Sequence, residues 1–146
     1  MDVSTIIEDV DELIKLGECL GEKLHGGEVI ELIGDVGTGK TTLVKGIAKS
    51  LGVKEAISSP SFPILLSYVA DNGVRLNHYD FYRLDDPGIM KSEISESLCD
   101  AKTITIVEWG DSVSGVLPDN RMTIRMQYLP SDTGREIIID ESLDKL

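Results

Sequence analysis

This chain of 146 residues lacks several features, and each absence excludes a class of protein. It contains two cysteines, Cys19 and Cys99, which are too few for a disulfide framework and have no metal-ligand spacing. We expect them to be half-buried structural thiols in a reducing compartment. No apolar run approaches the roughly 18 residues of a membrane span, and the acidic first residues do not resemble a secretory signal. These observations predict a cytoplasmic protein with a single domain over residues 1–146.

Basic residues are also scarce. The chain has 14 lysines and arginines against 26 aspartates and glutamates, a net charge of −12. A surface this acidic repels phosphate backbones, so extensive direct binding to nucleic acid is not expected. A protein partner with a basic face fits the charge better.

One motif stands out among the features that are present. Residues 34–41 read Gly-Asp-Val-Gly-Thr-Gly-Lys-Thr and match the phosphate-binding pattern G-x-x-x-x-G-K-[ST]. An apolar run precedes the motif and a helical apolar pattern follows it, which is the context that such a loop requires. Glycines allow the backbone N–H groups to form an anion cradle, the lysine reaches the β- and γ-phosphates, and the next hydroxyl ligates Mg²⁺. We therefore expect Mg²⁺ at Thr41 and a nucleoside triphosphate bound by Gly34, Asp35, Val36, Gly37, Thr38, Gly39, Lys40, Thr41 and Thr42.

The remaining pattern predicts a P-loop α/β fold, with a mixed parallel and antiparallel sheet flanked by helices. Asp9 is a cap for a first helix whose apolar face begins at Val10, and Asp85-Asp86-Pro87 opens a later helix that runs to residue 98. Asp71-Asn72-Gly73 is a hairpin signal. Strands are expected at residues 3–7, 28–33, 64–70, 74–79, 103–107, 121–128 and 135–140, further helices at 43–51 and, as a short helix or turn, at 110–117.

A P-loop enzyme also needs an acid at the end of a neighbouring strand. Glu108 and Asp80 both qualify, because each follows a predicted strand. We favour Glu108 as the second Mg²⁺ ligand. Asp80 then orients the attacking water or holds a water of the metal. A lone acid of this kind is more often a solvated strand end, but two of them beside a P-loop favour a site.

Three further features lie near these positions. His78 precedes Asp80 on the same strand and is expected to be a packed or half-exposed sheet residue. Trp109 either lines the nucleotide site or packs in the core. The loop Ser59-Pro60-Ser61-Phe62 lies where P-loop enzymes place a phosphate-sensing switch, and the Ser61 hydroxyl is a candidate sensor, although a plain loop explains these residues as well.

Fragments of guanine-nucleotide motifs also occur. Residues 77–80 are similar to Asn-Lys-x-Asp, but they lack the lysine. Residues 85–88 fit Asp-x-x-Gly, and the two fragments stand in the reverse of the GTPase order. We interpret them as coincidences and expect ATP as the nucleotide.

Taken in order, the motifs resemble those of the TsaE family. The matching stretches are residues 34–42, the Ser59–Phe62 loop, the run His-Tyr-Asp-Phe-Tyr-Arg-Leu at 78–84 and Val-Glu-Trp at 107–109. The resemblance implies an ATPase required for N6-threonylcarbamoyladenosine at tRNA position 37, which acts on a TsaB–TsaD complex. It also implies that Thr41 and Glu108 ligate Mg²⁺ and that Asp80 is needed for catalysis with Lys40. Ser61 and Pro63 depart from the family pattern, in which threonine is usual at both positions.

Two other functions are compatible with a P-loop. A small-molecule kinase needs a lid that carries arginines, and this chain has five arginines and no insertion long enough for a lid. A non-catalytic nucleotide-binding adaptor keeps Lys40 and Thr41 but has no need of Asp80 and Glu108.

Overall fold

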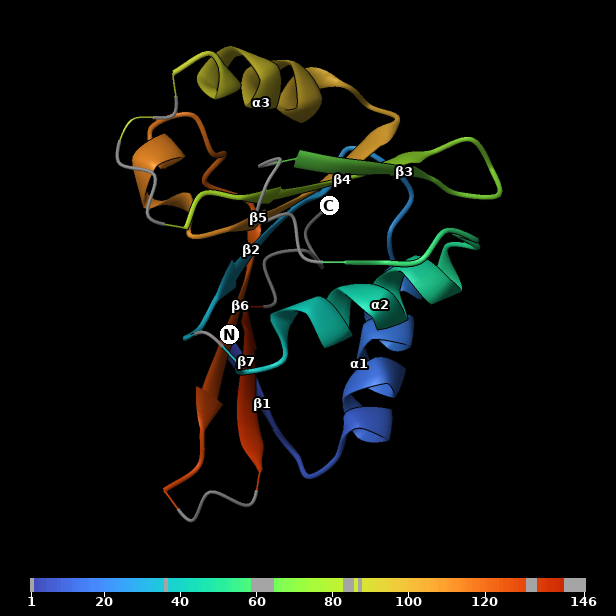
Figure 1. Ribbon diagram of the computed structural model, residues 1–146, viewed down its shortest axis with the longest axis vertical. Helices are drawn as coiled ribbons and strands as arrows, with labels where there is room; N and C mark the ends of the chain where they lie inside the picture. The colour runs from blue at the N-terminus through green and yellow to red at the C-terminus, as the bar shows by residue number, and fades with distance from the viewer. Residues whose placement is uncertain are drawn as a thin grey trace.

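The structure, a computed structural model, describes residues 2–35, 37–58, 65–82, 86, 88–130 and 134–140. These residues form one seven-stranded sheet in the order β1-β7-β6-β2-β5-β4-β3. Helices α1 and α2 cover one face of the sheet, and α3 with the short 3-10 helix η1 covers the other (Figure 1). The strands are β1 (Asp2–Ile7), β2 (Val29–Ile33), β3 (Leu65–Val69), β4 (Arg75–Asp80), β5 (Thr103–Glu108), β6 (Met122–Tyr128) and β7 (Arg135–Asp140); the helices are α1 (Val10–Glu22), α2 (Lys40–Ser50), α3 (Met90–Cys99) and η1 (Gly110–Val113).

The expected mixed sheet is confirmed. Its four middle strands, β6, β2, β5 and β4, run parallel, whereas β7 and β1 at one edge and β3 at the other are antiparallel to their neighbours. Parallel strands bring their carboxyl ends to the same edge of a sheet, where α/β proteins bind their ligands. The phosphate-binding loop follows β2 at that edge.

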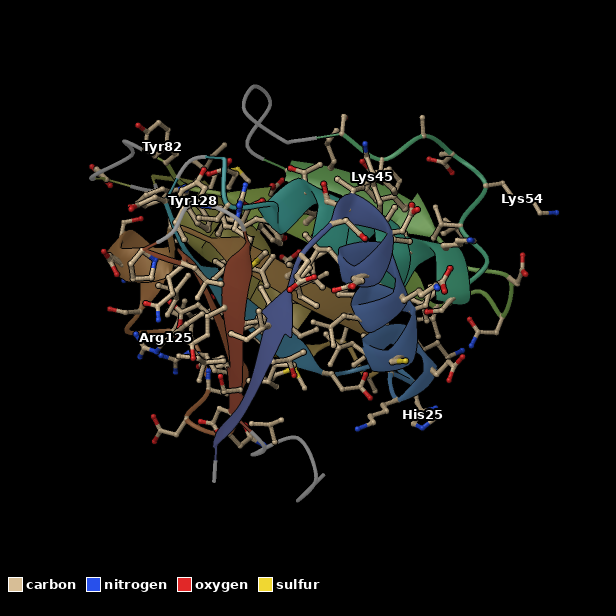
Figure 2. All side chains as sticks on the ribbon, turned by 90° about the horizontal axis from the view of Figure 1, so that it is seen from below. His25, Lys45, Lys54, Tyr82, Arg125 and Tyr128 are labelled. Atoms are coloured by element: carbon tan, nitrogen blue, oxygen red, sulfur yellow. The ribbon has the colours of Figure 1, made fainter. Side chains whose placement is uncertain are left out.

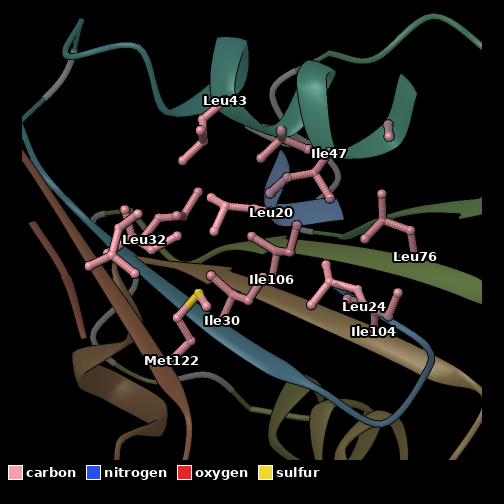
Figure 3. Packing of buried hydrophobic residues seen from close by; sticks show 14 of the residues in the cluster. Leu20, Leu24, Ile30, Leu32, Leu43, Ile47, Leu76, Ile104, Ile106 and Met122 are labelled. Carbon is pink, nitrogen blue, oxygen red and sulfur yellow. The ribbon is translucent and has the colours of Figure 1, made fainter. Parts of the chain in front are cut away.

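The larger core lies between the sheet and the helix pair α1 and α2. Leu43 and Ile47 of α2 pack over Ile30 and Ile106 of the sheet, all fully buried (Figure 3). The two helices approach closely where glycines meet: a Cβ added to Gly46 would lie 2.2 Å from the carbonyl oxygen of Ile14. This contact fixes α2, and with it the start of α2 at Lys40, against α1.

Helix α1 begins after the predicted cap residue. Asp9 is the N-cap, and its Oδ1 accepts a hydrogen bond from the Glu12 N–H at 2.8 Å. Glu12 reaches back to the N–H of Glu8 at 3.0 Å, one residue before the cap. The prediction that the apolar face begins at Val10 was wrong, because Val10 is the first residue of α1 and its side chain is 61% exposed. The first buried side chain of the helix is that of Leu13.

Two other expectations need correction. The helix expected from residue 85 begins at Met90, because Gly88 adopts a positive φ of 55° that right-handed helix does not allow; Asp85 and Pro87 lie outside the described residues. Cys19 and Cys99 are exposed rather than half-buried, since Cys19 is on the solvent side of α1 and Cys99 is the last residue of α3. Among the described helices, none has the length and apolarity needed to cross a bilayer.

The predicted hairpin between β3 and β4 is confirmed. Gly73 has a φ of 82°, and Asn72 Oδ1 accepts a hydrogen bond from the Val74 N–H at 3.1 Å. The strands it joins pair antiparallel, with Leu66 opposite His78. On its other side β4 pairs parallel with β5, which brings Asp80 next to that strand.

Candidate functional site

The phosphate-binding loop is held from within by Thr38. This side chain is 1% exposed, and its hydroxyl donates to the Asp35 carbonyl at 2.8 Å. Gly37 and Gly39 have φ values of 85° and 103°, which side chains rarely adopt, so the motif's glycines are required by the backbone. Val36 lies outside the described residues.

The start of α2 faces the same loop. Its N-cap, Gly39, has no side chain to bond the first helical N–H groups. The Leu43 N–H bonds back to the Gly39 carbonyl, so the N–H groups of Thr41 and Thr42 precede the first bond of the helix ladder. Such a helix end carries partial positive charge and suits a phosphate group.

Lys40 extends into the mouth of the loop. Its side chain is 7% exposed, and Nζ donates to the Gly34 carbonyl at 2.5 Å. The same Nζ lies 3.7 Å from Glu108 Oε1 and 4.3 Å from the centroid of the Trp109 ring. The lysine therefore joins the loop to the end of β5.

The two predicted acids lie beside each other at that end of the sheet. Asp80 of β4 pairs in register with Glu108 of β5, and Glu108 pairs on its other side with Leu32, two residues before the loop. Glu108 is buried, with 3% exposure. Asp80 is half-buried and accepts a hydrogen bond from the Tyr82 N–H at 2.9 Å.

Burial raises the pKa of the Asp80 carboxyl above its ordinary value. The Tyr82 N–H opposes this shift, and repulsion from the Glu108 charge adds to it. Lys40 and His78 act weakly in the opposite direction. Asp80 is therefore a stronger base than an exposed aspartate.

His78 makes a contact that the sequence analysis missed. Its ring is fully buried, and Nε2 lies 2.5 Å from Glu108 Oε2. We expected a packed or half-exposed sheet residue, and His78 is packed. Its ring also bonds the carboxylate of Glu108. The contact could have been anticipated from the alternation of side chains along β4, which places His78 and Asp80 on the same face of the sheet.

The neighbouring Asn77 points to the opposite face. Its side chain accepts from Ser67 at 2.6 Å and donates to Ser97 of α3 at 3.2 Å. The fragment of a guanine motif at residues 77–80 is therefore part of strand β4, with a structural asparagine.

Trp109 follows Glu108 in a left-handed conformation, with φ 55° and ψ 49°. It is the one non-glycine residue with positive φ in the described part of the chain. Its ring lies 4.8 Å from that of Tyr82, and together with Gly34 and Asp35 it borders a cavity of about 180 Å³. Trp109 packs against the smaller core, which is one of the two alternatives considered for it, and it also borders the loop. That it contacts a nucleotide stays a prediction.

On the other side of the loop lies Tyr128, at the carboxyl end of β6. Its hydroxyl is 2.8 Å from the position that a Cβ on Gly37 would take, and the Arg135 guanidinium covers its ring at 4.2 Å. Figure 2 shows Tyr82 and Tyr128 at the same end of the molecule, far from Lys54. Aromatic side chains therefore border the phosphate loop on both sides.

The donor set fits a magnesium ion that is bound together with a nucleotide. Within the described residues, no three histidines, cysteines or acids gather to hold a metal by themselves. Thr41 supplies a hydroxyl and Glu108 a carboxylate, and Mg²⁺ commonly takes its other ligands from phosphates and water. The predicted switch residues Ser59, Pro60, Ser61 and Phe62, and also Pro63, lie outside the described residues.

Comparisons with known proteins agree on one family. The model of "Threonylcarbamoyl adenosine biosynthesis protein TsaE" matches residues 7–137. The tRNA threonylcarbamoyladenosine biosynthesis protein TsaE of Treponema pallidum is 32% identical over 92% of this chain and 97% of its own length. The Streptomyces coelicolor protein of the same name is 32% identical over 84% of each chain. The crystal structure of Bacillus subtilis YdiB superposes with a TM-score of 0.76 at 27% identity, over 95% of this chain and 84% of that one.

Proposed function

The chain belongs to the TsaE family of tRNA threonylcarbamoyladenosine biosynthesis, and we propose that it binds and hydrolyses ATP with Mg²⁺. One observation carries the proposal. Lys40 of the loop, Glu108 of β5 and Asp80 of β4 come together at one edge of the sheet, with Lys40 Nζ 3.7 Å from Glu108. A loop that only bound a nucleotide would have no need of the two acids.

In this proposal the phosphates lie across the loop of residues 34–41. The backbone N–H groups of the loop and the start of α2 bind the phosphate oxygens, and Lys40 turns from the Gly34 carbonyl to the β- and γ-phosphates. Thr42 and Trp109 complete the nucleotide contacts. The cavity beside Trp109 gives the ring an open side toward the loop.

Thr41 and Glu108 would hold the metal, one at the start of α2 and the other at the end of β5. When bound, Mg²⁺ neutralises charge on the phosphate oxygens as the γ-phosphoryl group leaves. Glu108 suits this position because its strand is the direct neighbour of β2, whereas Asp80 lies one strand further away. Its Oε1 faces Lys40 and therefore the loop.

Asp80 is then the residue that acts on water. Its carboxylate orients a water molecule toward the γ-phosphorus and accepts a proton as the oxygen attacks. The bond from the γ-phosphorus to the β–γ bridging oxygen breaks, and ADP leaves with that electron pair. Asp80 is assigned this role because its pKa is raised and because Glu108 contacts His78 and faces Lys40.

Two of the arginines in the described part of the chain are held on the sheet, which favours the ATPase over a small-molecule kinase. A kinase lid needs arginines that can reach the phosphates. Arg121 is paired with Glu31 at 2.8 Å, and Arg75 bonds Ser67 at 3.1 Å. Arg135 covers the ring of Tyr128.

We further propose a TsaB–TsaD complex as the partner, bound more tightly with ATP than with ADP. In this proposal the γ-phosphate orders the Ser59–Phe62 loop, which then completes the docking face. The net charge of −12 favours binding to a partner protein with a basic face. Free tRNA should bind weakly to this chain and lose most of its affinity at physiological salt. A role in tRNA modification fits the cytoplasm.

Calorimetric titration tests the binding step. ADP and a non-hydrolysable ATP analogue are titrated into the chain with excess Mg²⁺ and, separately, with excess EDTA. The proposal expects saturable binding of both ligands and tighter binding of the analogue with Mg²⁺. No binding under either condition would refute it, and tight binding that ignores Mg²⁺ would favour the non-catalytic adaptor.

A further inference from the structure

We propose that His78 is a positioning residue for Glu108. Its imidazole holds one oxygen of the Glu108 carboxylate so that the other oxygen faces Lys40 and the phosphate loop. This inference rests on the proposed function, in which Glu108 is a ligand of Mg²⁺.

The two oxygens of Glu108 have different partners from different elements. Oε2 lies 2.5 Å from Nε2 of His78 on β4, and Oε1 lies 3.7 Å from Nζ of Lys40 at the start of α2. The carboxylate is 3% exposed and the imidazole 0% exposed, so water does not compete for this contact. A carboxylate held at one oxygen has a fixed direction for the other.

The strand register explains how the ring reaches this position. His78 pairs with Ile106, two residues before Glu108 on β5, while Asp80 pairs with Glu108 itself. Side chains two apart on a strand lie on the same face of the sheet. The imidazole therefore contacts the Glu108 carboxylate from the interior of the sheet, two residues before the ends of β4 and β5.

Packing alone does not account for a histidine here. The Nδ1 atom is buried and has no hydrogen-bond partner among the described residues, which costs free energy. The neighbouring inward positions Leu76, Ile104 and Ile106 hold apolar side chains that are just as buried at no such cost. The hydrogen bond to Glu108 is the contact that an apolar residue would lack.

Holding a ligand carboxylate in one rotamer prepares the site for the metal. Carboxylates that bind metals are commonly hydrogen-bonded from behind, and loss of such a partner lowers metal affinity by roughly 10- to 100-fold. In the proposed function the phosphate cradle is made by backbone groups and Lys40, and His78 is not part of it. We therefore expect His78 to control how much Mg²⁺ strengthens nucleotide binding, and to leave metal-free binding unchanged.

Three variants separate the hydrogen bond from the volume of the ring. In His78→Gln the amide nitrogen takes the place of Nε2, whereas in His78→Asn the amide is too short to reach Glu108. His78→Leu fills the space without a donor. Each variant is titrated calorimetrically with a non-hydrolysable ATP analogue, once with EDTA and once with Mg²⁺, and its melting temperature is measured by circular dichroism.

We expect all variants to bind the analogue in EDTA within about twofold of the wild type. The gain in affinity from Mg²⁺ should fall about tenfold or more in His78→Asn and His78→Leu and stay within about threefold of the wild type in His78→Gln. If His78→Leu does not fold, the comparison of the two amides decides. An undiminished Mg²⁺ gain in His78→Asn, or equal losses in both amides, would overturn the inference. A wild-type chain that shows no Mg²⁺ gain would instead overturn the proposed function.

Discussion

Asp80 and Glu108 occupy directly opposed positions on the parallel strands β4 and β5, so that two carboxylates stand side by side at the carboxyl edge of the sheet. Opposed like charges destabilise a sheet unless other groups compensate for them. Lys40 and His78 lie on the Glu108 side of the pair, while the backbone N–H of Tyr82 bonds Asp80. Asp80 is left with the raised pKa, and we propose Asp80 as the base and Glu108 as the metal ligand.

This arrangement predicts that Asp80→Asn abolishes hydrolysis and stabilises the fold at neutral pH. The pKa of Asp80 is raised in the folded chain, so its stabilising effect is complete below the ordinary pKa of 3.8 and is lost as the pH rises through the folded pKa. Asparagine has no charge at any pH, and its amide oxygen still accepts the Tyr82 hydrogen bond. The variant should melt roughly 2 °C above the wild type at pH 7, as measured by differential scanning calorimetry.

The pH dependence provides the control for this prediction. The difference in melting temperature should shrink as the pH falls toward 4 and vanish below it, where the wild-type carboxyl is protonated as well. If the variant is less stable than the wild type at pH 7, the charge of Asp80 stabilises the folded chain. That result would contradict a raised pKa.

For the metal, Glu108→Gln should cut Mg²⁺-dependent hydrolysis at least tenfold, while ADP still binds. Glutamine keeps the shape of the side chain but removes the negative charge that a hard cation needs. Asp111→Asn is the matched control, since Asp111 is an exposed acid three residues further along the chain. Unchanged turnover of Glu108→Gln at saturating Mg²⁺ would move the metal ligand to Asp80.

Lys40→Ala should weaken ATP binding about tenfold or more. It removes the lysine whose Nζ bonds the loop at Gly34, and a charge-assisted hydrogen bond contributes about 1.5–3 kcal/mol. Lys45→Ala serves as the control, because Lys45 is exposed on the same helix (Figure 2). Equal affinities of wild type and Lys40→Ala in calorimetry would mean that the loop does not bind phosphate in the expected manner.

Gly46→Ala should destabilise the fold by roughly 1–3 kcal/mol, in spite of the better helix propensity of alanine. The added Cβ would lie 2.2 Å from the Ile14 carbonyl oxygen and 2.9 Å from the Cα of Gly17, so α1 and α2 must move apart. The gain in propensity is only about 1 kcal/mol. Urea denaturation measures the difference, and Gly115→Ala, where nothing lies within 4 Å of the added atom, should leave stability nearly unchanged.

The phosphate-binding loop could be predicted from the sequence because its determinants are local. The glycine spacing, the strand before it and the helix after it all lie within residues 29–51, and the structure has β2, the loop and α2 there. The hairpin at Asn72 and the cap at Asp9 are local in the same sense. The start of α3 was predicted too early. Residues 85–87 have the composition of a helix start, and the sequence did not reveal that Gly88 adopts a positive φ, which prevents the helix from beginning before it.

The arrangement of the acids was beyond the sequence alone. Both Asp80 and Glu108 could be placed at strand ends, but their opposition depends on β4 and β5 being neighbours in register, which is set by tertiary packing. The contact of His78 with Glu108 depends further on the rotamers of two buried side chains. The left-handed backbone of Trp109 could not be foreseen either, since bulky residues rarely adopt it.

Steady-state ATP hydrolysis, measured in the presence of Mg²⁺ for this chain alone and with a TsaB–TsaD complex, tests whether the chain is a partner-dependent ATPase. Lys40→Ala and Asp80→Asn are measured in parallel under the same conditions. We expect weak turnover by the chain alone, a rise of about tenfold or more when the partner complex is added, and loss of turnover in both variants. Absence of hydrolysis by the wild type with the partners present, or equal turnover in the wild type and both variants, would contradict it.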